Sequence, residues 1–305
     1  MIIKGILVSL VAPMDDHIAN GGEKIFGNAS SIKQRPDGRV YISGQKQRHA
    51  LFSAIGRLNE DNSTYVSNGD GITTIIENDL RADLGGFLDT NKGSYSGRRT
   101  APVTATPGVA IDPSNIGRDL LIRLKVNEDK NSERSQALAT REYSEHDDML
   151  MNFFIDTGAV SIRRRCTYEK EMHLKTEFVK HVAETERKRR VRLTLEATNA
   201  LTDYANNARN ATSGEPQKVL IVFDTRLSRK ASRYFTAKST EQNNILAELG
   251  SRDAVYFQGD DTDANQDSVS VAYEKALVFL DKNDLYDPSG GDGSIETTEQ
   301  FENRK

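Results

Sequence analysis

The stretch IIKGILVSLVA, residues 2–12, gives the strongest signal for the fold. It is rich in isoleucine, leucine and valine, and it stops at Pro13, a residue that central strands avoid. A short apolar run bounded in this way predicts a buried strand. A second run, KVLIVFDT at residues 218–225, gives an equally strong signal. We therefore expect a core sheet built on two buried strands that lie far apart in the sequence.

Helical signals lie between these strands. RVYIS, residues 39–43, predicts a short strand, and from Gly44 onward a helix is predicted because Leu51, Ile55 and Leu58 repeat at helical spacing. A long helix is predicted over residues 184–207 and a short one over 240–250. MNFFIDTGAVSIRRRC, residues 151–166, predicts two short strands joined by a turn. The resulting order of strand, helix, strand, strand, helix, strand is the βαββαβ pattern of an α+β, ferredoxin-like fold.

The remaining segments define the expected domain organisation. Residues 60–149 have weak periodicity and many turn formers, which predicts an insertion that projects from the core. Its clearest strand is 119–126, and 132–143 is expected to be a second arm or a short helix. Residues 268–281 predict a strand-like or mixed element. The expected parts are a discontinuous core of 1–59 and 150–280, an insertion at 60–149, and an acidic, flexible tail at 281–305.

Charge is distributed unevenly along the 305 residues. The formal net charge is -4, but residues 241–305 hold 15 acidic and 5 basic side chains, which leaves a surplus of six positive charges in residues 1–240. Residues 163–192 alone carry 11 basic and 5 acidic side chains. A basic body favours an anionic partner such as a nucleic acid.

Several classes of protein are excluded. The single cysteine, Cys166, cannot form an internal disulfide, and the five histidines show no zinc-ligand spacing. The sequence holds no phosphate-binding loop, no nucleophile elbow and no His-Glu-x-x-His motif, so neither enzymatic activity nor a metal or other cofactor is expected. No apolar run is long enough to span a membrane, and the N-terminal run does not resemble a signal peptide, so we expect a cytoplasmic protein.

The predicted helix start at Gly44 carries unusual charge. Lys46 and Arg48 lie in its first turns, where the helix dipole disfavours cations unless an anion is bound. Free backbone amides at a helix N-terminus bind anions, and Ser43 and Gln45 add neutral donors. The motif therefore predicts a phosphate site, with a solvated helix start as the alternative.

Other basic clusters have two interpretations each. Arg163, Arg164 and Arg165 follow a predicted strand, so alternate side chains should point to opposite faces, either toward a phosphate or as charges that protect an edge. Residues 186–192 are interpreted as the outer face of a helix. Arg98 and Arg99 lie in a Gly- and Pro-rich segment that could order on a polyanion or serve as a connector.

The order of these features resembles a known family. The stretches HIANGGEKIFGNASSIKQRPDGRVYISGQKQRHAL, RRTAPVTATPGVAI, NFFIDTGAVSIRR and KVLIVFDTR together resemble the backbone subunits of type I CRISPR surveillance complexes, the Cascade complexes. These subunits form the Cas-seven superfamily, and the DevR-like group of type I-B systems is the most similar. The resemblance implies a modified ferredoxin-like (RRM-like) palm with inserted fingers and a thumb. It also implies partners: CRISPR RNA, further copies arranged head to tail, other Cascade subunits, and target DNA read through the guide.

The resemblance also assigns site residues. Ser43, Gln45, Lys46 and Arg48 would contact the RNA backbone, Arg98 and Arg99 would belong to the finger or thumb region, and Arg163, Arg164 and Arg165 to the adjoining palm. Lys24 and Lys33 would belong to a basic loop before the helix. The acidic tail receives no family role.

Two other functions stay open. The first is an endoribonuclease that uses Asp15 or Asp16, which follow the first strand, because related backbone subunits of type III complexes cleave RNA with an acidic residue in a loop. The second is an unrelated ferredoxin-like assembly protein whose basic face binds an acidic partner protein.

Overall fold

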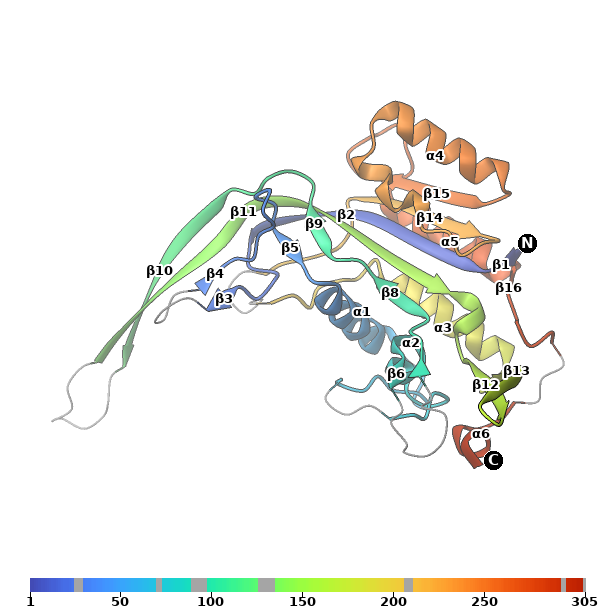
Figure 1. The fold of residues 1–305 in the computed structure, drawn as a ribbon. Coiled ribbons are helices and arrows are strands. Elements are labelled where there is room, and N and C mark those ends of the chain that lie inside the picture. The colour runs from blue at the N-terminus through green and yellow to red at the C-terminus, as the bar shows by residue number, and fades with distance from the viewer. Residues whose placement is uncertain are drawn as a thin grey trace.

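The central sheet is built around β2 (Gly5–His17), which contains the strongest predicted strand (Figure 1). The computed structural model describes residues 1–24, 30–69, 73–88, 98–125, 135–205, 211–291 and 295–303. β2 pairs antiparallel with β11 (Ser135–Asp156) on one side and with β14 (Lys218–Asp224) on the other. β15 (Val255–Asp260) pairs antiparallel with β14. The two strands predicted to form the core are therefore neighbours.

β2 continues past Pro13, where the sequence predicts its end. Its pairing with β14 begins at Gly5 and stops at Val11, whereas its pairing with β11 continues to His17. Beyond Val11 the strand has only one described neighbour in the sheet, and an edge strand tolerates the missing N–H of proline.

Helices cover both faces of this sheet (Figure 1). Ile6 and Leu10 of β2 belong to one apolar cluster together with buried side chains of α1, α3 and α5. Leu7, which points the other way, packs in a second cluster with Ile245 and Leu249 of α4. The protein is thus a mixed α/β structure with a layered core. The helix bounds are α1 (Gly44–Leu58), α3 (Glu184–Ala197), α4 (Ser239–Ser251) and α5 (Val269–Lys282).

β11 extends well beyond the core. Its C-terminal half pairs with β2, while its N-terminal half pairs with β10 (Ile116–Lys125) to form an arm that projects from the body (Figure 1). The segment 132–143 is therefore a second arm over its described residues, and the predicted boundary between 149 and 150 falls inside β11. On the far edge of β11 lie β8 (Val103–Ala105) and β9 (Gly108–Ala110), and β9 also pairs with β5 (Tyr41–Ile42).

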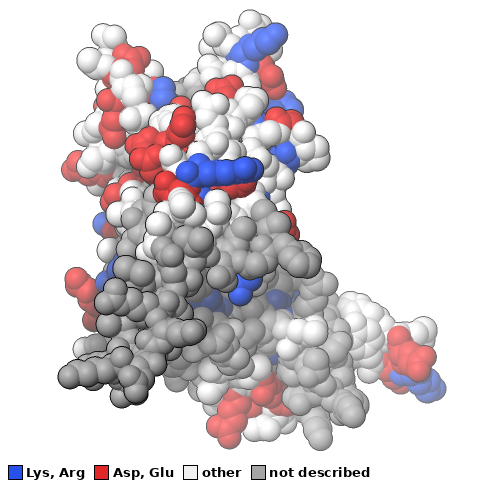
Figure 2. Space-filling view, turned by 90° about the vertical axis from the view of Figure 1, so that its left-hand side faces the viewer, with Lys and Arg blue, Asp and Glu red and all other residues white. Residues whose placement is uncertain are grey.

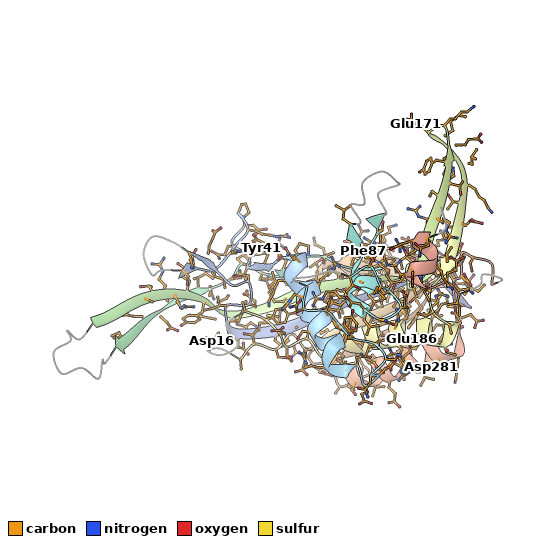
Figure 3. All side chains as sticks on the ribbon, turned by 90° about the horizontal axis from the view of Figure 1, so that it is seen from below. Asp16, Tyr41, Phe87, Glu171, Glu186 and Asp281 are labelled. Atoms are coloured by element: carbon orange, nitrogen blue, oxygen red, sulfur yellow. The ribbon has the colours of Figure 1, made fainter. Side chains whose placement is uncertain are left out.

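The predicted pair of strands at 151–166 is arranged differently. Residues 151–156 complete β11, but the second stretch becomes β12 (Ile162–Glu169), which leaves the sheet and, among the described strands, pairs with β13 (Met172–Lys180) alone. The turn at Lys170 and Glu171 has positive φ values of 46° and 69°. Figure 3 shows Glu171 at the tip of this projecting hairpin, at the opposite end of the molecule from the arm.

Two predicted elements differ in type or length. Residues 268–281, expected to be strand-like or mixed, form α5, because Val269, Ala272, Tyr273, Ala276 and Leu280 share one buried helical face. The helix predicted over 184–207 ends at Ala197. The remaining elements are β1 (Ile2–Ile3), β3 (Glu23–Lys24), β4 (Ser30–Ser31), α2 (Leu80–Gly85), β6 (Phe87–Leu88), β7 (Arg98–Arg99), η1 (Thr157–Ala159), η2 (Lys230–Thr236), β16 (Asp284–Leu285) and α6 (Thr298–Asn303).

The C-terminal segment contacts the body at several places. For example, β16 pairs in parallel with β1, and Glu296 accepts a hydrogen bond from Arg165. These contacts lie within the region expected to be a flexible tail. Among the described helices, none is both long and apolar enough to cross a membrane.

Candidate nucleic-acid interface

The N-terminus of α1 is the most defined of the predicted anion sites. Ser43 is the N-cap, and its Oγ accepts a hydrogen bond of 3.2 Å from the backbone N–H of Lys46. Helix geometry leaves the amides of Gly44 and Gln45 without intrahelical acceptors. The first turn contains no acidic residue, Ser43 and Gln45 are exposed, and Lys46 is half-buried. This helix start combines a positive dipole end with a lysine and can bind an anion.

Close packing fixes the position of this helix start. A Cβ atom at Gly44 would lie 2.9 Å from the carbonyl oxygen of Ala105, which is closer than side chains tolerate. A Cβ at Gly108 would lie 2.1 Å from Nε2 of Gln47, a fully buried side chain whose Oε1 accepts a hydrogen bond of 2.9 Å from the Tyr204 hydroxyl. Glycine is therefore required at position 44 by the approach of the segment that joins β8 to β9.

Lys33 lies beside the strand that leads into α1. Its carbonyl oxygen accepts a hydrogen bond from the backbone N–H of Tyr41 at 3.4 Å. Asn20 Nδ2 donates both to that oxygen and to the carbonyl of Tyr41. Lys24 is exposed on β3, next to β4. The structure thus brings the Lys33 backbone next to the α1 motif and places Lys24 on a separate part of the sheet edge.

The side chain of Arg48 is half-buried and bonded within the protein, so it is not exposed beside the helix start. Its Nη2 donates to the carbonyl oxygen of Gly85 at 2.5 Å, and its guanidinium lies 5.8 Å from the centre of the Phe52 ring. Burial lowers the pKa of the Arg48 guanidinium below its ordinary value. The side chain joins α1 to the end of α2, so it is engaged with the protein and does not extend the exposed anion site.

Arg99 is buried and fully engaged inside the protein. Its guanidinium donates to the carboxylate and the carbonyl of Asp83 and to the carbonyl oxygens of Ile162 and Ala159. Burial opposes the ionisation of Asp83, but the charges of Arg99 and Arg190 outweigh that effect and hold the pKa of Asp83 below its ordinary value. Arg99 therefore has a structural role, which removes it from any surface that could contact RNA. The side chain of Arg98 lies outside the described residues.

Some of the basic side chains of α3 point into the protein. The sequence predicts residues 186–192 as an outer helix face, but Arg187 and Arg190 are fully buried. Arg190 Nη1 donates to Asp83 Oδ2 at 2.8 Å, and Arg187 donates to the carbonyl oxygens of Val160 and Thr157. The prediction fails because the counter-ion of Arg190 comes from α2, a short helix in a segment with weak periodicity.

The three arginines of β12 alternate as the strand pattern predicts. Arg164 is exposed, while Arg163 is buried and Arg165 is half-buried on the other face. Arg163 forms an ion pair of 3.4 Å with Glu302, and Arg165 one of 2.6 Å with Glu296. The C-terminal segment therefore occupies two of the three side chains that were candidates for RNA contact.

Asp15 and Asp16, which the sequence predicts to follow the first strand, lie inside the last part of β2, where Asp15 contacts an exposed histidine of β11. Asp15 Oδ1 lies 2.6 Å from Nδ1 of His146, and Asp148 lies 3.8 Å from the other ring nitrogen. The hydrogen bond to Asp15 raises the pKa of His146. Asp16 has a left-handed backbone with φ of 43° and lies at the end of β2, far from Glu171 (Figure 3). A histidine held by a carboxylate can act as an acid–base group, and the sequence alone did not single out His146.

Charge is not uniform over the surface. On the face shown in Figure 2, Asp and Glu side chains lie among the Lys and Arg side chains across the upper part, the region of α4, β14 and β15. A mixed surface of this kind does not favour a polyanion. Among the described residues, no group of three or more His, Cys, Asp or Glu side chains could hold a metal ion.

Comparisons with known proteins identify a similar fold. No family model and no curated protein sequence matches the chain. A chain of a solved structure titled "CRISPR RNA-guided surveillance complex" superposes with a TM-score of 0.58 at 10% identity, over 90% of this chain and 99% of that one. A chain of a second structure, titled "CRISPR RNA-guided surveillance complex, pre-nicking", gives 0.57 at 11% identity over the same shares. In fold, the protein is therefore similar to chains found in CRISPR RNA-guided surveillance complexes.

Proposed function

We propose that the protein is a non-catalytic backbone subunit of a type I, I-B-like Cascade complex in the cytoplasm, where it binds CRISPR RNA and presents it for pairing with target DNA. The observation that carries this proposal is the likeness to the solved chains, which extends over 90% of this chain and 99% of the first of them. In this role, specificity lies in base pairing of the guide, and the protein holds the RNA backbone.

The strand order supports a modified ferredoxin-like palm. β14, β2, β11 and β8 are neighbours in that order, and each adjacent pair is antiparallel. In sequence, α1 lies between β2 and β8, and α3 lies between β11 and β14. This is a βαββαβ connection with insertions before β8 and within the β10–β11 arm.

The shape of the chain supports head-to-tail assembly with further copies and with other Cascade subunits. The arm and the β12–β13 hairpin project at opposite ends (Figure 3). Each carries exposed apolar side chains: Leu120 and Ile122 on the arm, and Met172 and Leu174 on the hairpin. Different apolar surfaces at two ends suit a heterologous contact, which generates filaments when it does not close.

The α1 N-terminus is the proposed RNA grip, with Ser43, Gln45 and Lys46 as its side chains and Lys33 beside it. A phosphate there would meet two free amides, a helix dipole and a lysine. Because no acidic side chain lies in the first turn, nothing in that turn repels the RNA backbone. Contacts of this kind depend on salt and are nearly independent of sequence.

The test is binding of a labelled single-stranded RNA of mixed sequence to the purified full chain, over a series of salt concentrations. Lys46→Glu should weaken binding about tenfold or more, which corresponds to the loss of one charged hydrogen bond, and should reduce the slope of log K against log salt by about 0.7. Lys238→Glu is the matched control, because Lys238 is exposed at the start of α4 on the other face of the sheet. Equal effects of the two substitutions, or no binding at low salt, would contradict the proposal.

A second candidate function is RNA cleavage near the end of β2. The contact of 2.6 Å between Asp15 and His146 favours it, since a histidine oriented by a carboxylate is a common acid–base group. Incubation of the full chain with labelled RNA should then give cleavage products. These products should disappear in the Asp15→Asn and His146→Gln variants, and the Asp16→Ala variant shows whether the second acidic residue is needed. Intact RNA after long incubation would exclude this activity.

A further inference from the structure

The C-terminal strap, residues 295–303, covers the base of the β12–β13 hairpin. It begins with a bridge between Ile295 and Lys180, and Glu296 donates its backbone N–H to the Lys180 carbonyl at 2.9 Å. Thr298 Oγ1 donates to Glu77 at 2.5 Å. The strap thus reaches from the hairpin to the loop before α2, and it ends with α6, which is only six residues long.

The strap presents an aromatic ring and two carboxylates to arginines. The Phe301 ring lies 4.2 Å from the guanidinium of Arg163 and 4.6 Å from that of Arg165. Glu302 and Glu296 form the ion pairs with the same two arginines. Stacking of an arginine on an aromatic ring and pairing of its charge with an anion are also how arginines hold a base and a phosphate of single-stranded RNA.

A buried histidine lies beneath the strap. His181 is 3% exposed, its ring centre is 5.4 Å from that of Phe301, and neither of its ring nitrogens has a hydrogen-bond partner among the described residues. The pKa of His181 is lowered to about 4, mainly by burial and to a smaller extent by the charges of Arg163 and Arg99. The ring is therefore neutral near pH 7. A buried donor and acceptor left unpaired are costly, and a ligand with polar atoms would satisfy them.

We propose that Arg163, Arg165 and His181 form a subsite for one nucleotide of single-stranded RNA, and that the strap occupies this subsite until RNA displaces it. A phosphate would take the place of the strap carboxylates, and a base would take the place of the Phe301 ring. The inference rests on the proposed RNA binding at α1. The strap would then act as an intramolecular competitor that keeps the subsite closed in the absence of RNA.

The position of the subsite is compatible with a strand that also contacts α1. Tyr41, next to the start of α1, and Phe87 lie along one edge of the molecule, and α6 continues that edge toward the hairpin (Figure 3). The Arg163 guanidinium lies 5.5 Å from the Phe87 ring, which connects the subsite to the strand that follows α2. A helix as short as α6 has little stability of its own, so its release from these contacts is local.

The test compares two substitutions that remove the same charge from the strap. Glu296→Gln removes the charge that pairs with Arg165, whereas Glu299→Gln removes the charge of an exposed side chain. In full-chain protein, Glu296→Gln combined with Phe301→Ala should bind single-stranded RNA roughly fivefold more tightly, and Glu299→Gln should bind like the wild type. Adding Arg165→Ala should cancel the gain and leave the binding that depends on Lys46.

A second measurement needs no variant. Hydrogen exchange of residues 295–303 in the wild-type chain should accelerate when RNA is added, because the strap leaves its site. No gain in affinity together with unchanged exchange would overturn the strap proposal, while a persisting effect of Lys46→Glu would leave the proposed function intact. If Lys46→Glu has no effect but the strap variant gains affinity, the subsite stands and the α1 grip is wrong.

Discussion

Replacing Asp83 with asparagine should destabilise the protein more than any surface substitution. Asp83 is fully buried and accepts hydrogen bonds from Arg99, from Arg190 Nη1 at 2.8 Å, and from the backbone and hydroxyl of Ser161 at 2.8 and 2.6 Å. Ser161 has φ of 56°, a left-handed conformation that these two contacts help to hold.

The magnitude follows from the charges left behind. Asparagine keeps a similar shape but no charge, so Arg99 and Arg190 would remain buried with less counter-charge, and one of their donors would face an NH2 group. Breaking a buried ion pair by removing one partner costs about 3–5 kcal/mol. Asp61→Asn is the matched control, because Asp61 lies at the surface and is 3.4 Å from Arg189, a contact worth about 0–1 kcal/mol.

The assay is urea unfolding at pH 7, followed by circular dichroism, for both variants and for Asp83→Asn combined with Arg190→Met. The double variant should lose less stability than the sum of the single ones, because it removes a guanidinium that Asp83→Asn leaves unpaired. Folding lowers the pKa of Asp83 below its ordinary value of 3.8. In the wild type, the ionised carboxylate therefore stabilises the protein at pH values above 3.8, and this stabilisation is lost as the pH falls below that value and through the lowered pKa. A loss below about 1 kcal/mol for Asp83→Asn, or one equal to that of Asp61→Asn, would refute this account.

Three further outcomes are expected, two at the proposed RNA grip and one at the contact between Asp15 and His146. Gly44→Ala should lower the unfolding free energy and weaken RNA binding, because its Cβ would lie 2.9 Å from the Ala105 carbonyl; unchanged urea midpoints would contradict the close approach. Ser43→Ala should cost about 0.5–2 kcal/mol in the same assay through loss of the N-cap, whereas Ser43→Gly should cost only a few tenths. In NMR titration, His146 should show a raised pKa that returns toward its ordinary value in Asp15→Asn, and its contribution to stability should be present at low pH and disappear as the pH rises through that raised pKa.

Local patterns were sufficient for much of the core. The strand at β2, the strand at β14 and the helix from Gly44 each have a periodicity or an apolar run that a short window reveals. Residues 268–281 were misassigned because valine and aromatic residues favour strands, although their apolar positions also repeat at helical spacing. There, burial on one face against the sheet outweighs the local preference.

The site could be predicted only in part, because burial of a charge depends on a distant partner. The helix start at α1 was visible from Ser43, Gly44 and Lys46 alone. The burial of Arg99 and Arg190 was not, since their common counter-ion, Asp83, lies in a segment with weak periodicity. Likewise, nothing local indicates that Glu296 would pair with a residue of β12.

The arrangement of β2 has a consequence for how the chain is made. Gly5 pairs with Asp156 on one side and with Asp224 on the other, so both neighbours of the central strand are synthesised long after it. At ordinary translation rates the second neighbour emerges roughly 10–40 s later. Until β11 emerges, this apolar strand has two open edges on the nascent chain, and until β14 emerges it has one; contacts of such long range also make folding slow. We therefore expect the yield of native protein to depend on a chaperone that shields this segment during synthesis.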